Sequence, residues 1–192
     1  MAASTTRERL IEKMTELALE NGFHAIGIDR LLAEVGISKQ TFYNHFESKE
    51  DLVLAVVMRR DVNVFDEMMA LLEKHGGADA RGQLEAVFDL LDTWFNDPTF
   101  NGCLFVTAVS EFPQLHDPIH MAVSKHLKRV EQKLCYLAAE AGYANPLELA
   151  QQYMILIEGA LIVRHVTGNL KIANIARAMG KRLLEERAPE TV

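Results

Sequence analysis

Residues 38–46 read SKQTFYNHF, and this stretch decides the fold of the N-terminal part of the chain. Ser38 is a residue type that caps helices, and polar and aromatic side chains follow it at helical spacing. Phe42 and Phe46 lie one helical turn apart, so they share a face and predict a buried anchor. The opposite face carries hydrogen-bonding side chains, an arrangement with which a helix can read DNA bases.

The segments before this stretch complete a three-helix unit. Residues 28–37 read IDRLLAEVGI, which predicts a short helix over residues 28–35 and a turn at Gly36. Further upstream, Thr5 and Glu8 form a capping-box pattern that starts a helix over residues 6–20. A short helix, a glycine turn and a capped third helix are typical of a helix-turn-helix.

The rest of the chain is predicted to be helical as well. Apolar residues recur every three or four positions, and no strand-like alternation of useful length occurs, so the expected fold is all-α. Ser48 is expected to cap a long helix that ends at Gly76. Asp117 and Asn145 each precede a proline and predict helix starts. The later helices are expected over residues 80–96, 102–111, 118–141, 146–166 and 170–186.

Composition limits the classes of protein. The chain has 192 residues, 49% of them apolar, which is enough for a substantial core. The apolar runs are too short to span a bilayer and no signal peptide is recognisable, so we expect a cytoplasmic protein that does not contact a membrane. The net charge is −7, and residues 1–49 carry six cations against seven acids. A DNA-binding surface must therefore come from cations and helix N-termini gathered on one face.

Residues 12–54 carry a family resemblance in four places, NGF at 21–23, GISK at 36–39, FYNHF at 42–46 and SKEDL at 48–52. This stretch resembles the DNA-binding domain of TetR-family transcriptional regulators. The resemblance implies a helix-turn-helix DNA-binding domain over residues 1–50 and a helical ligand-binding and dimerisation domain over residues 51–192. It also implies a homodimeric repressor that a small apolar or aromatic ligand releases from a palindromic double-stranded operator.

The roles of the DNA-contacting side chains follow from chemistry and from the resemblance. Lysine can donate to guanine, and glutamine or asparagine can pair with adenine. We expect bases to be read by Lys39, Gln40 and Asn44. We expect phosphates to be contacted by Arg30, Ser38, Thr41, Tyr43, His45 and Lys49. Gly27 stands where the family usually has Ser or Thr, so that hydroxyl contact is missing here.

Aromatic and large apolar residues of the larger domain are candidates for a ligand pocket. The resemblance implies an inducer cavity between helices, and a cavity of this kind is usually apolar. The candidates are Phe65, Met68, Met69, Phe88, Leu91, Trp94, Phe95, Phe105, Val106, Met121 and Tyr153. For any one of these residues packing in an ordinary core is the favoured interpretation, because such residues at helical spacing usually pack against each other.

The last two expected helices carry more apolar residues than one buried face needs. We expect a dimer interface that includes Met154, Ile155, Leu161, Ile162, Val166, Ile175 and Met179. The alternative is that these residues are buried within one chain. Dimerisation is favoured because one chain holds one recognition helix, whereas operators are usually read by two.

Cysteine and histidine residues in the middle of the chain are candidates for a sensor thiol and a metal site. Cys103 lies near an expected helix N-terminus, so it is a candidate sensor thiol, although most isolated cysteines are inert. His116 and His120 have the spacing of a metal pair, but Pro118 starts the helix between them, so we expect no metal site and no cofactor. Two other classes of protein, an enzyme and a helical adaptor that binds only protein, could have the same all-helical core. No nucleophile, base and orienting group occur at supportive spacing, so we expect no enzymatic activity.

Overall fold

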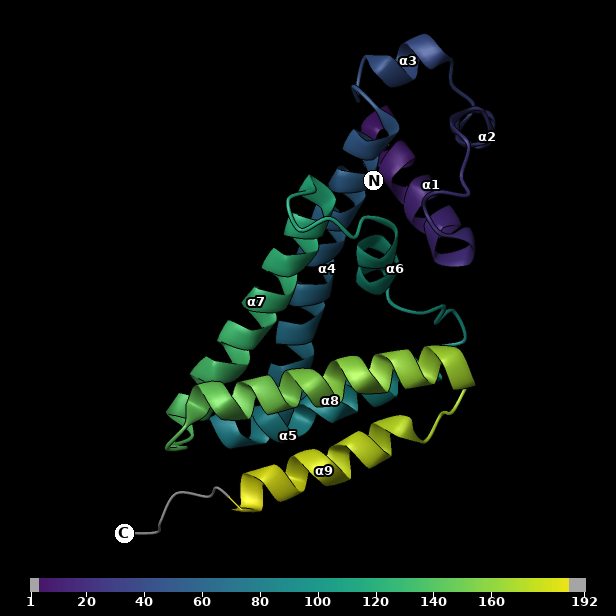
Figure 1. Ribbon diagram of the computed structural model, residues 1–192. Coiled ribbons are helices and arrows are strands. Elements are labelled where there is room, and N and C mark those ends of the chain that lie inside the picture. Colours follow the sequence, from purple (N-terminus) through teal and green to yellow (C-terminus); the bar gives the residue numbers. More distant parts are fainter. Residues whose placement is uncertain (1–3, 187–192) are drawn as a thin grey trace. The chain divides into compact units, whose positions relative to one another are not determined.

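The structure is a computed structural model that describes residues 4–186 of the chain (Figure 1). Over these residues the chain is all-helical and contains no strand, which confirms the predicted fold class. The helices are α1 (Thr6–Asn21), α2 (Ile28–Val35), α3 (Lys39–Tyr43), α4 (Lys49–Gly76), α5 (Ala80–Asn96), α6 (Leu104–Glu111), α7 (Pro118–Glu140), α8 (Pro146–Thr167) and α9 (Ile172–Glu186). None of these helices is both long enough and apolar enough to cross a membrane.

Two compact units make up the described chain. Unit 1 contains the chain up to Asn63 together with Cys103–His126, and unit 2 contains Val64–Gly102 together with the chain from Leu127 onward. Helices α4 and α7 each contribute their first part to unit 1 and the remainder to unit 2. The domain boundary expected after residue 50 lies at the start of α4, whereas the compact units divide this helix after Asn63.

The predicted capping box starts α1. The N–H group of Glu8 donates to the Thr5 hydroxyl at 3.2 Å, and the N–H group of Thr5 donates to the Glu8 carboxylate at 2.9 Å. The backbone hydrogen bond from Thr5 favours the ionised form and lowers the pKa of Glu8. At the other end Gly22 has a φ of +76°, which favours glycine, so α1 ends where the sequence predicts.

Helices α2 and α3 form the predicted helix-turn-helix pair. Helix α2 has the predicted bounds and ends at Gly36, whose φ of +75° is left-handed. Ser38 caps α3, because its hydroxyl accepts a hydrogen bond from the N–H group of Thr41 at 3.1 Å. The regular helix is shorter than the quoted run, since the His45 N–H group donates to the carbonyl only three residues back, at Phe42.

Removal of the α3 cap has a measurable expected cost. Helix α3 has five residues, so one unsatisfied N–H group is a large fraction of its backbone hydrogen bonding. We expect Ser38→Ala to lower the free energy of unfolding by about 1 kcal/mol. Thermal unfolding of this variant, with Ser110→Ala on α6 as the matched control, measures the effect. A melting temperature equal to that of the wild type would argue against the capping role.

Buried side chains hold unit 1 together as predicted. Phe42 and Phe46 are both buried, with ring centroids 5.9 Å apart. The expected inner residues of α1 and α2 are buried too, namely Leu10, Met14, Leu17, Ala18, Leu31 and Leu32. Ser48 caps α4 by accepting from the Asp51 N–H group at 3.0 Å, also as predicted. The five-residue helix α3 is therefore held in place by the packing of Phe42 and Phe46 rather than by its own length.

Helices α5, α8 and α9 pack together in unit 2. Tyr153 of α8 lies against Phe88 of α5, with ring centroids 5.3 Å apart. A side chain at Gly180 would collide with the Phe88 ring, so this glycine permits α9 to lie close to α5. Gly159, which the sequence suggested for close helix approach, instead lies exposed with open space around it.

One predicted helix cap is wrong. The Asp117 carboxylate accepts from the Ile119 N–H group at 2.7 Å, as expected for the start of α7. Asn145 precedes α8 but makes no side-chain capping hydrogen bond. Its φ of −123° and ψ of 69° lie outside the extended conformation typical of a cap, so its amide does not reach the first turn.

Candidate nucleic-acid interface

The outer face of α3 presents the side chains that the sequence singled out. Lys39, Gln40, Tyr43, Asn44 and His45 are exposed, while the two phenylalanines of the same run point into unit 1. Because the aromatic side fixes the rotation of the helix about its axis, the polar side must face solvent. This surface consists of residues 38–41 and 43–45, and we name it the α3 surface.

The three expected base-reading residues lie together on the α3 surface. The Gln40 side-chain amide donates to the Asn44 side-chain oxygen at 3.2 Å, which places these groups on one face as predicted. The Lys39 ammonium lies 2.8 Å from the Asp29 carboxylate, which raises the pKa of Lys39. The sequence did not predict this pairing, because it depends on the angle between α2 and α3. A contact of Lys39 with a DNA base would require exchange or sharing of this pairing.

The expected phosphate contacts fall into two groups. Ser38 and Thr41 share a hydroxyl contact at 2.9 Å, and they lie beside the exposed Tyr43 and His45. Arg30 and Lys49 instead have partners inside unit 1. Arg30 donates to the Glu34 carboxylate at 3.1 Å, and Lys49 donates to the His24 carbonyl at 3.4 Å. Contact of either cation with a phosphate requires exchange or sharing of these bonds.

Helix α6 braces the turn between α1 and α2, a contact that the sequence did not reveal. The Glu111 carboxylate accepts from the His24 N–H group at 2.7 Å, and the Phe112 ring lies 4.9 Å from the His24 ring. The Glu111 carboxylate also lies close to Gly22, where the positive φ of +76° favours glycine. The sequence separation of 87 residues between His24 and Glu111 explains why no local pattern predicted this contact.

A buried histidine, His126, also lies in unit 1. His126 is buried, its Nδ1 lies 2.8 Å from the Asp61 carboxylate, and its ring stacks on Phe105 with centroids 3.8 Å apart. Phe105 was expected in a ligand pocket, but the structure gives it this stacking partner. Such a buried pair fixes the position of α4 relative to α7 within unit 1.

The expected ligand-pocket residues are divided between the units. Phe105, Val106 and Met121 belong to unit 1, and the other candidates belong to unit 2. Met121 is wrong as a pocket residue, because its side chain is 57% exposed on α7. The largest buried candidates in unit 2 are core residues, namely Phe88, Leu91, Phe95 and Tyr153. The Trp94 indole donates to Glu67 at 3.2 Å, and the Arg129 guanidinium lies 3.6 Å from the Phe65 ring centroid.

Burial raises the pKa of the Glu158 carboxyl on α8. The folded state therefore holds this proton more tightly than the unfolded chain. The resulting stabilisation is complete below the unfolded pKa of about 4.3 and is lost as pH rises through the folded pKa. We expect Glu158→Gln to unfold at a higher temperature than the wild type near neutral pH, and at an equal temperature below about pH 4. Melting curves across pH, with Glu140→Gln on α7 as control, test this; a pH-independent difference would contradict it.

The candidate sensor and metal residues occupy ordinary structural positions. Cys103 is half-buried at the N-cap position of α6 and is not in a disulfide. His120 Nδ1 lies 3.0 Å from the Phe112 carbonyl oxygen, while His116 is exposed in the loop before α7. Among residues 4–186 no three His, Cys, Asp or Glu side chains group in a way that could hold a metal ion.

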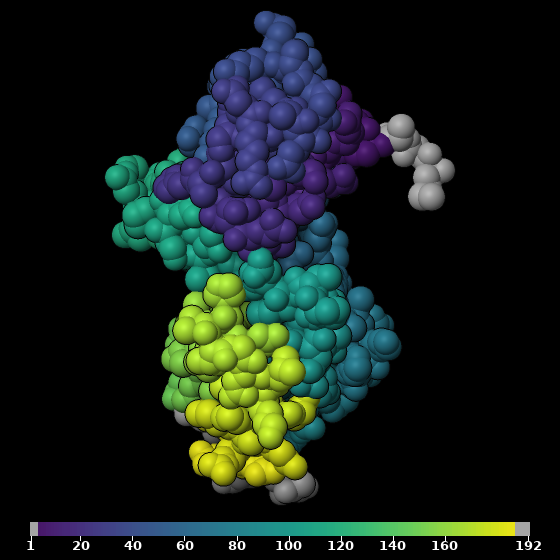
Figure 2. Space-filling view, turned by 90° about the vertical axis from the view of Figure 1, so that its right-hand side faces the viewer, coloured from purple at the N-terminus to yellow at the C-terminus, as the bar shows by residue number. Residues whose placement is uncertain are grey.

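Helices α8 and α9 lie side by side in unit 2 (Figure 2). Most of the expected dimer residues on these helices are exposed apolar side chains. Ile155 and Val166 are 72% and 74% exposed, and Ile162, Ile175 and Met179 are exposed as well. Met154 is half-buried. Leu161 is wrong as an interface residue, because it is buried within unit 2 and lies on the inner side of α8. The other residues leave an apolar stripe that includes the open surface at Gly159.

Comparisons with known proteins agree with this arrangement. The sequence pattern of "Bacterial regulatory proteins, tetR family" matches residues 10–56, and that of "Tetracyclin repressor-like, C-terminal domain" matches residues 80–179. The chain is 27% identical over 188 residues to the HTH-type transcriptional repressor NemR of Escherichia coli (strain K12), covering 93% of this chain and 94% of that protein.

Solved structures are similar over the same length. A TetR-family transcriptional regulator from Streptomyces coelicolor superposes with a TM-score of 0.90 at 27% identity, covering 97% of this chain and 91% of that one. The reduced form of E. coli NemR gives a TM-score of 0.82 at 25% identity, covering 92% and 95% of the two chains. The sequence patterns match both the helix-turn-helix and more than half of the chain, so the chain belongs to the TetR family of bacterial transcriptional regulators.

Proposed function

We propose that this protein is a homodimeric repressor that binds an inverted-repeat DNA operator and leaves it when a small molecule binds the larger domain. The observation that carries the proposal is the α3 surface, where Lys39, Gln40 and Asn44 are exposed and Phe42 is buried. Such a helix can enter the major groove, where each base pair presents a distinct pattern of donors and acceptors. Repression is favoured because the relative NemR is named a transcriptional repressor.

Two copies are needed for tight binding. One chain offers few free cations at or near the α3 surface, because Lys39, Arg30 and Lys49 all have partners in unit 1. The exposed stripe on α8 and α9 is apolar, which suits an interface between two identical chains. Its exposed glycine lets a partner helix approach closely. The dimer then presents two α3 surfaces to two half-sites about one helical turn apart, roughly 34 Å.

Release by a ligand follows as a shift between two populations of the dimer. Helix α4 runs through both units, so a ligand that binds unit 2 acts on the same helix that Ser48 caps in unit 1. Tilting α4 changes the separation of the two α3 surfaces, so both half-sites no longer bind at once. The ligand can only shift this balance by its difference in affinity for the two states.

Selection of DNA fragments from a random library tests this proposal. The full-length protein is expected to enrich one sequence with two inverted half-sites whose centres lie about ten base pairs, or a multiple of that, apart. Enrichment of a single half-site would contradict binding of the operator by a dimer. No enrichment over several rounds would contradict sequence-specific binding itself.

A further inference from the structure

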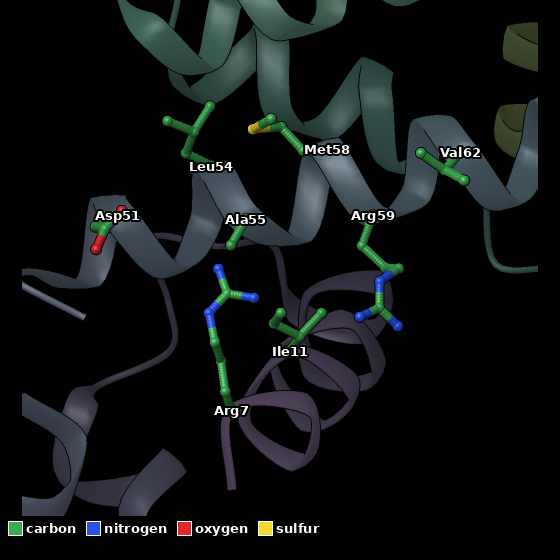
Figure 3. Close-up of a pocket in the computed structure, with 8 residues that line it drawn as sticks. All are labelled: Arg7, Ile11, Asp51, Leu54, Ala55, Met58, Arg59 and Val62. Carbon is green, nitrogen blue, oxygen red and sulfur yellow. The ribbon is translucent and has the colours of Figure 1, made fainter. Parts of the chain in front are cut away.

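A groove between α1 and α4 lies in unit 1, apart from the α3 surface (Figure 3). Its volume is about 360 Å³, at the lower end of the range for small-molecule sites. The groove is lined by Arg7, Ile11, Asp51, Leu54, Ala55, Met58, Arg59 and Val62. None of these residues is among those expected to contact DNA, the inducer or the dimer partner.

The α4 side of the groove is apolar although it faces solvent. Leu54, Met58 and Val62 recur every four residues, so they form one stripe along α4. Met58 is 57% exposed and Val62 is 48% exposed, while Ile11 of α1 is buried at the base. An apolar stripe beside a hollow provides a floor for a hydrocarbon chain or ring.

Two arginines supply positive charge at this floor. Figure 3 shows the Arg7 side chain reaching from α1 towards Ala55, and the Arg59 side chain reaching from α4 towards α1, with Ile11 between them. The nearest acid to Arg59 is Glu8 at 3.9 Å, and the other oxygen of that carboxylate is already bonded to Thr5 at 2.9 Å. Arg59 therefore retains donors for a second anion.

The other two charged residues in the groove lining, Arg7 and Asp51, each have one contact within unit 1. Arg7 lies over the Phe46 ring at 5.0 Å, which leaves the N–H groups at its edge free to donate. Asp51 is the acidic residue in the lining, and its carboxylate accepts from the Glu47 N–H group at 3.1 Å at the start of α4. The two guanidinium groups thus outnumber the one carboxylate in the lining, and guanidinium groups bind carboxylates through paired hydrogen bonds.

We propose that the α1–α4 groove binds an amphipathic monoanion, with the carboxylate on Arg7 and Arg59 and the apolar tail along Leu54, Met58 and Val62. This site differs from the inducer pocket expected in the larger domain. Its occupancy can be measured without DNA, so the outcome is independent of the proposed operator binding. Decanoate is a suitable probe, because it combines one carboxylate with a single unbranched chain.

Calorimetric titration of the full-length protein with decanoate tests the proposal. Acetate lacks the tail and decyltrimethylammonium has the opposite charge, so both are expected to bind at least about tenfold more weakly than decanoate. Arg59→Ala and Met58→Glu are each expected to weaken decanoate binding about tenfold or more. Met58 is exposed, so a glutamate there leaves the fold intact. Arg60→Ala, on the same helix but outside the lining, is the matched control and is expected to bind like the wild type.

Three results of these titrations would overturn the proposal. Absence of decanoate binding at millimolar concentration would show that the α1–α4 groove is not a site for such an anion. Binding that Arg59→Ala and Met58→Glu both leave unchanged places the ligand elsewhere in the chain. Equal binding of decanoate and decyltrimethylammonium shows that the arginines do not select charge, and this also contradicts the assignment.

Discussion

Replacement of both Lys39 and Gln40 by alanine is expected to abolish the preference of this protein for its operator over random DNA. Each bidentate contact with a base edge discriminates by about 1–3 kcal/mol, so the double variant is expected to lose about 2–6 kcal/mol of specific binding free energy. Both side chains are exposed on α3, so their removal leaves the anchoring Phe42 and Phe46 in place. Fluorescence anisotropy with labelled operator and scrambled duplexes measures the loss.

The same experiment separates base reading from general electrostatics. Lys128 and Gln132 form an exposed lysine and glutamine pair on α7, so Lys128→Ala with Gln132→Ala is the matched control and is expected to bind like the wild type. The double variant on α3 keeps its weak affinity for random DNA, because phosphate contacts carry that part. If it retained operator preference, the assignment of base reading to Lys39 and Gln40 would be wrong.

Glutamates at positions 155 and 166 are expected to convert the dimer to a monomer. Ile155 and Val166 are the most exposed apolar side chains of the stripe on α8, so the double substitution leaves the monomer fold intact. In an interface each glutamate would be a buried, unpaired charge, at a cost of roughly 3–5 kcal/mol. Operator affinity is expected to fall at least about a hundredfold, since a monomer engages one half-site only.

Sedimentation analysis of the Ile155→Glu, Val166→Glu variant tests the interface directly. Tyr136→Glu is the control, because Tyr136 is also apolar and exposed but lies on α7 outside the stripe. The control is expected to remain dimeric, and both proteins should keep the melting temperature of a folded chain. A double variant that still sediments as a dimer would place the interface elsewhere.

Local signals explain why so many helix ends were predictable. The bounds of α2 and α5 agree with prediction, because Gly36 ends one helix and Asp79, whose carboxylate accepts from the Gly82 N–H group, starts the other. The predicted cap of α8 at Asn145 was wrong because the local backbone does not suit a cap. A favourable residue type is not enough when the backbone dihedral angles point its side chain away from the first turn.

Long-range packing set the features that the sequence did not reveal. The contacts of Glu111 with His24, and of Gly180 with the Phe88 ring, join segments far apart in the chain, so no short pattern indicates them. The same reason accounts for Leu161 and Met121. Helical spacing shows that a helix has an apolar side, but the neighbouring helices decide which of its apolar residues are covered.

The candidate DNA surface was easier to predict than the candidate ligand pocket. On α3 two aromatic residues fix the orientation, so exposure of the polar side chains follows from spacing. What spacing could not show is that Asp29 holds Lys39 in the free protein, because that pair depends on how α2 crosses α3. The base-reading and phosphate-contacting roles of these residues stay predictions.

Sequence-specific DNA binding by two copies of the chain is tested most directly by one titration. The full-length protein is added to its upstream DNA region and to a scrambled duplex of equal length, at two salt concentrations, with the number of chains per duplex determined at saturation. We predict two chains per site, at least about a thousandfold preference for the upstream region, and weaker binding at the higher salt concentration. Equal affinity for the two duplexes at moderate salt would contradict the claim.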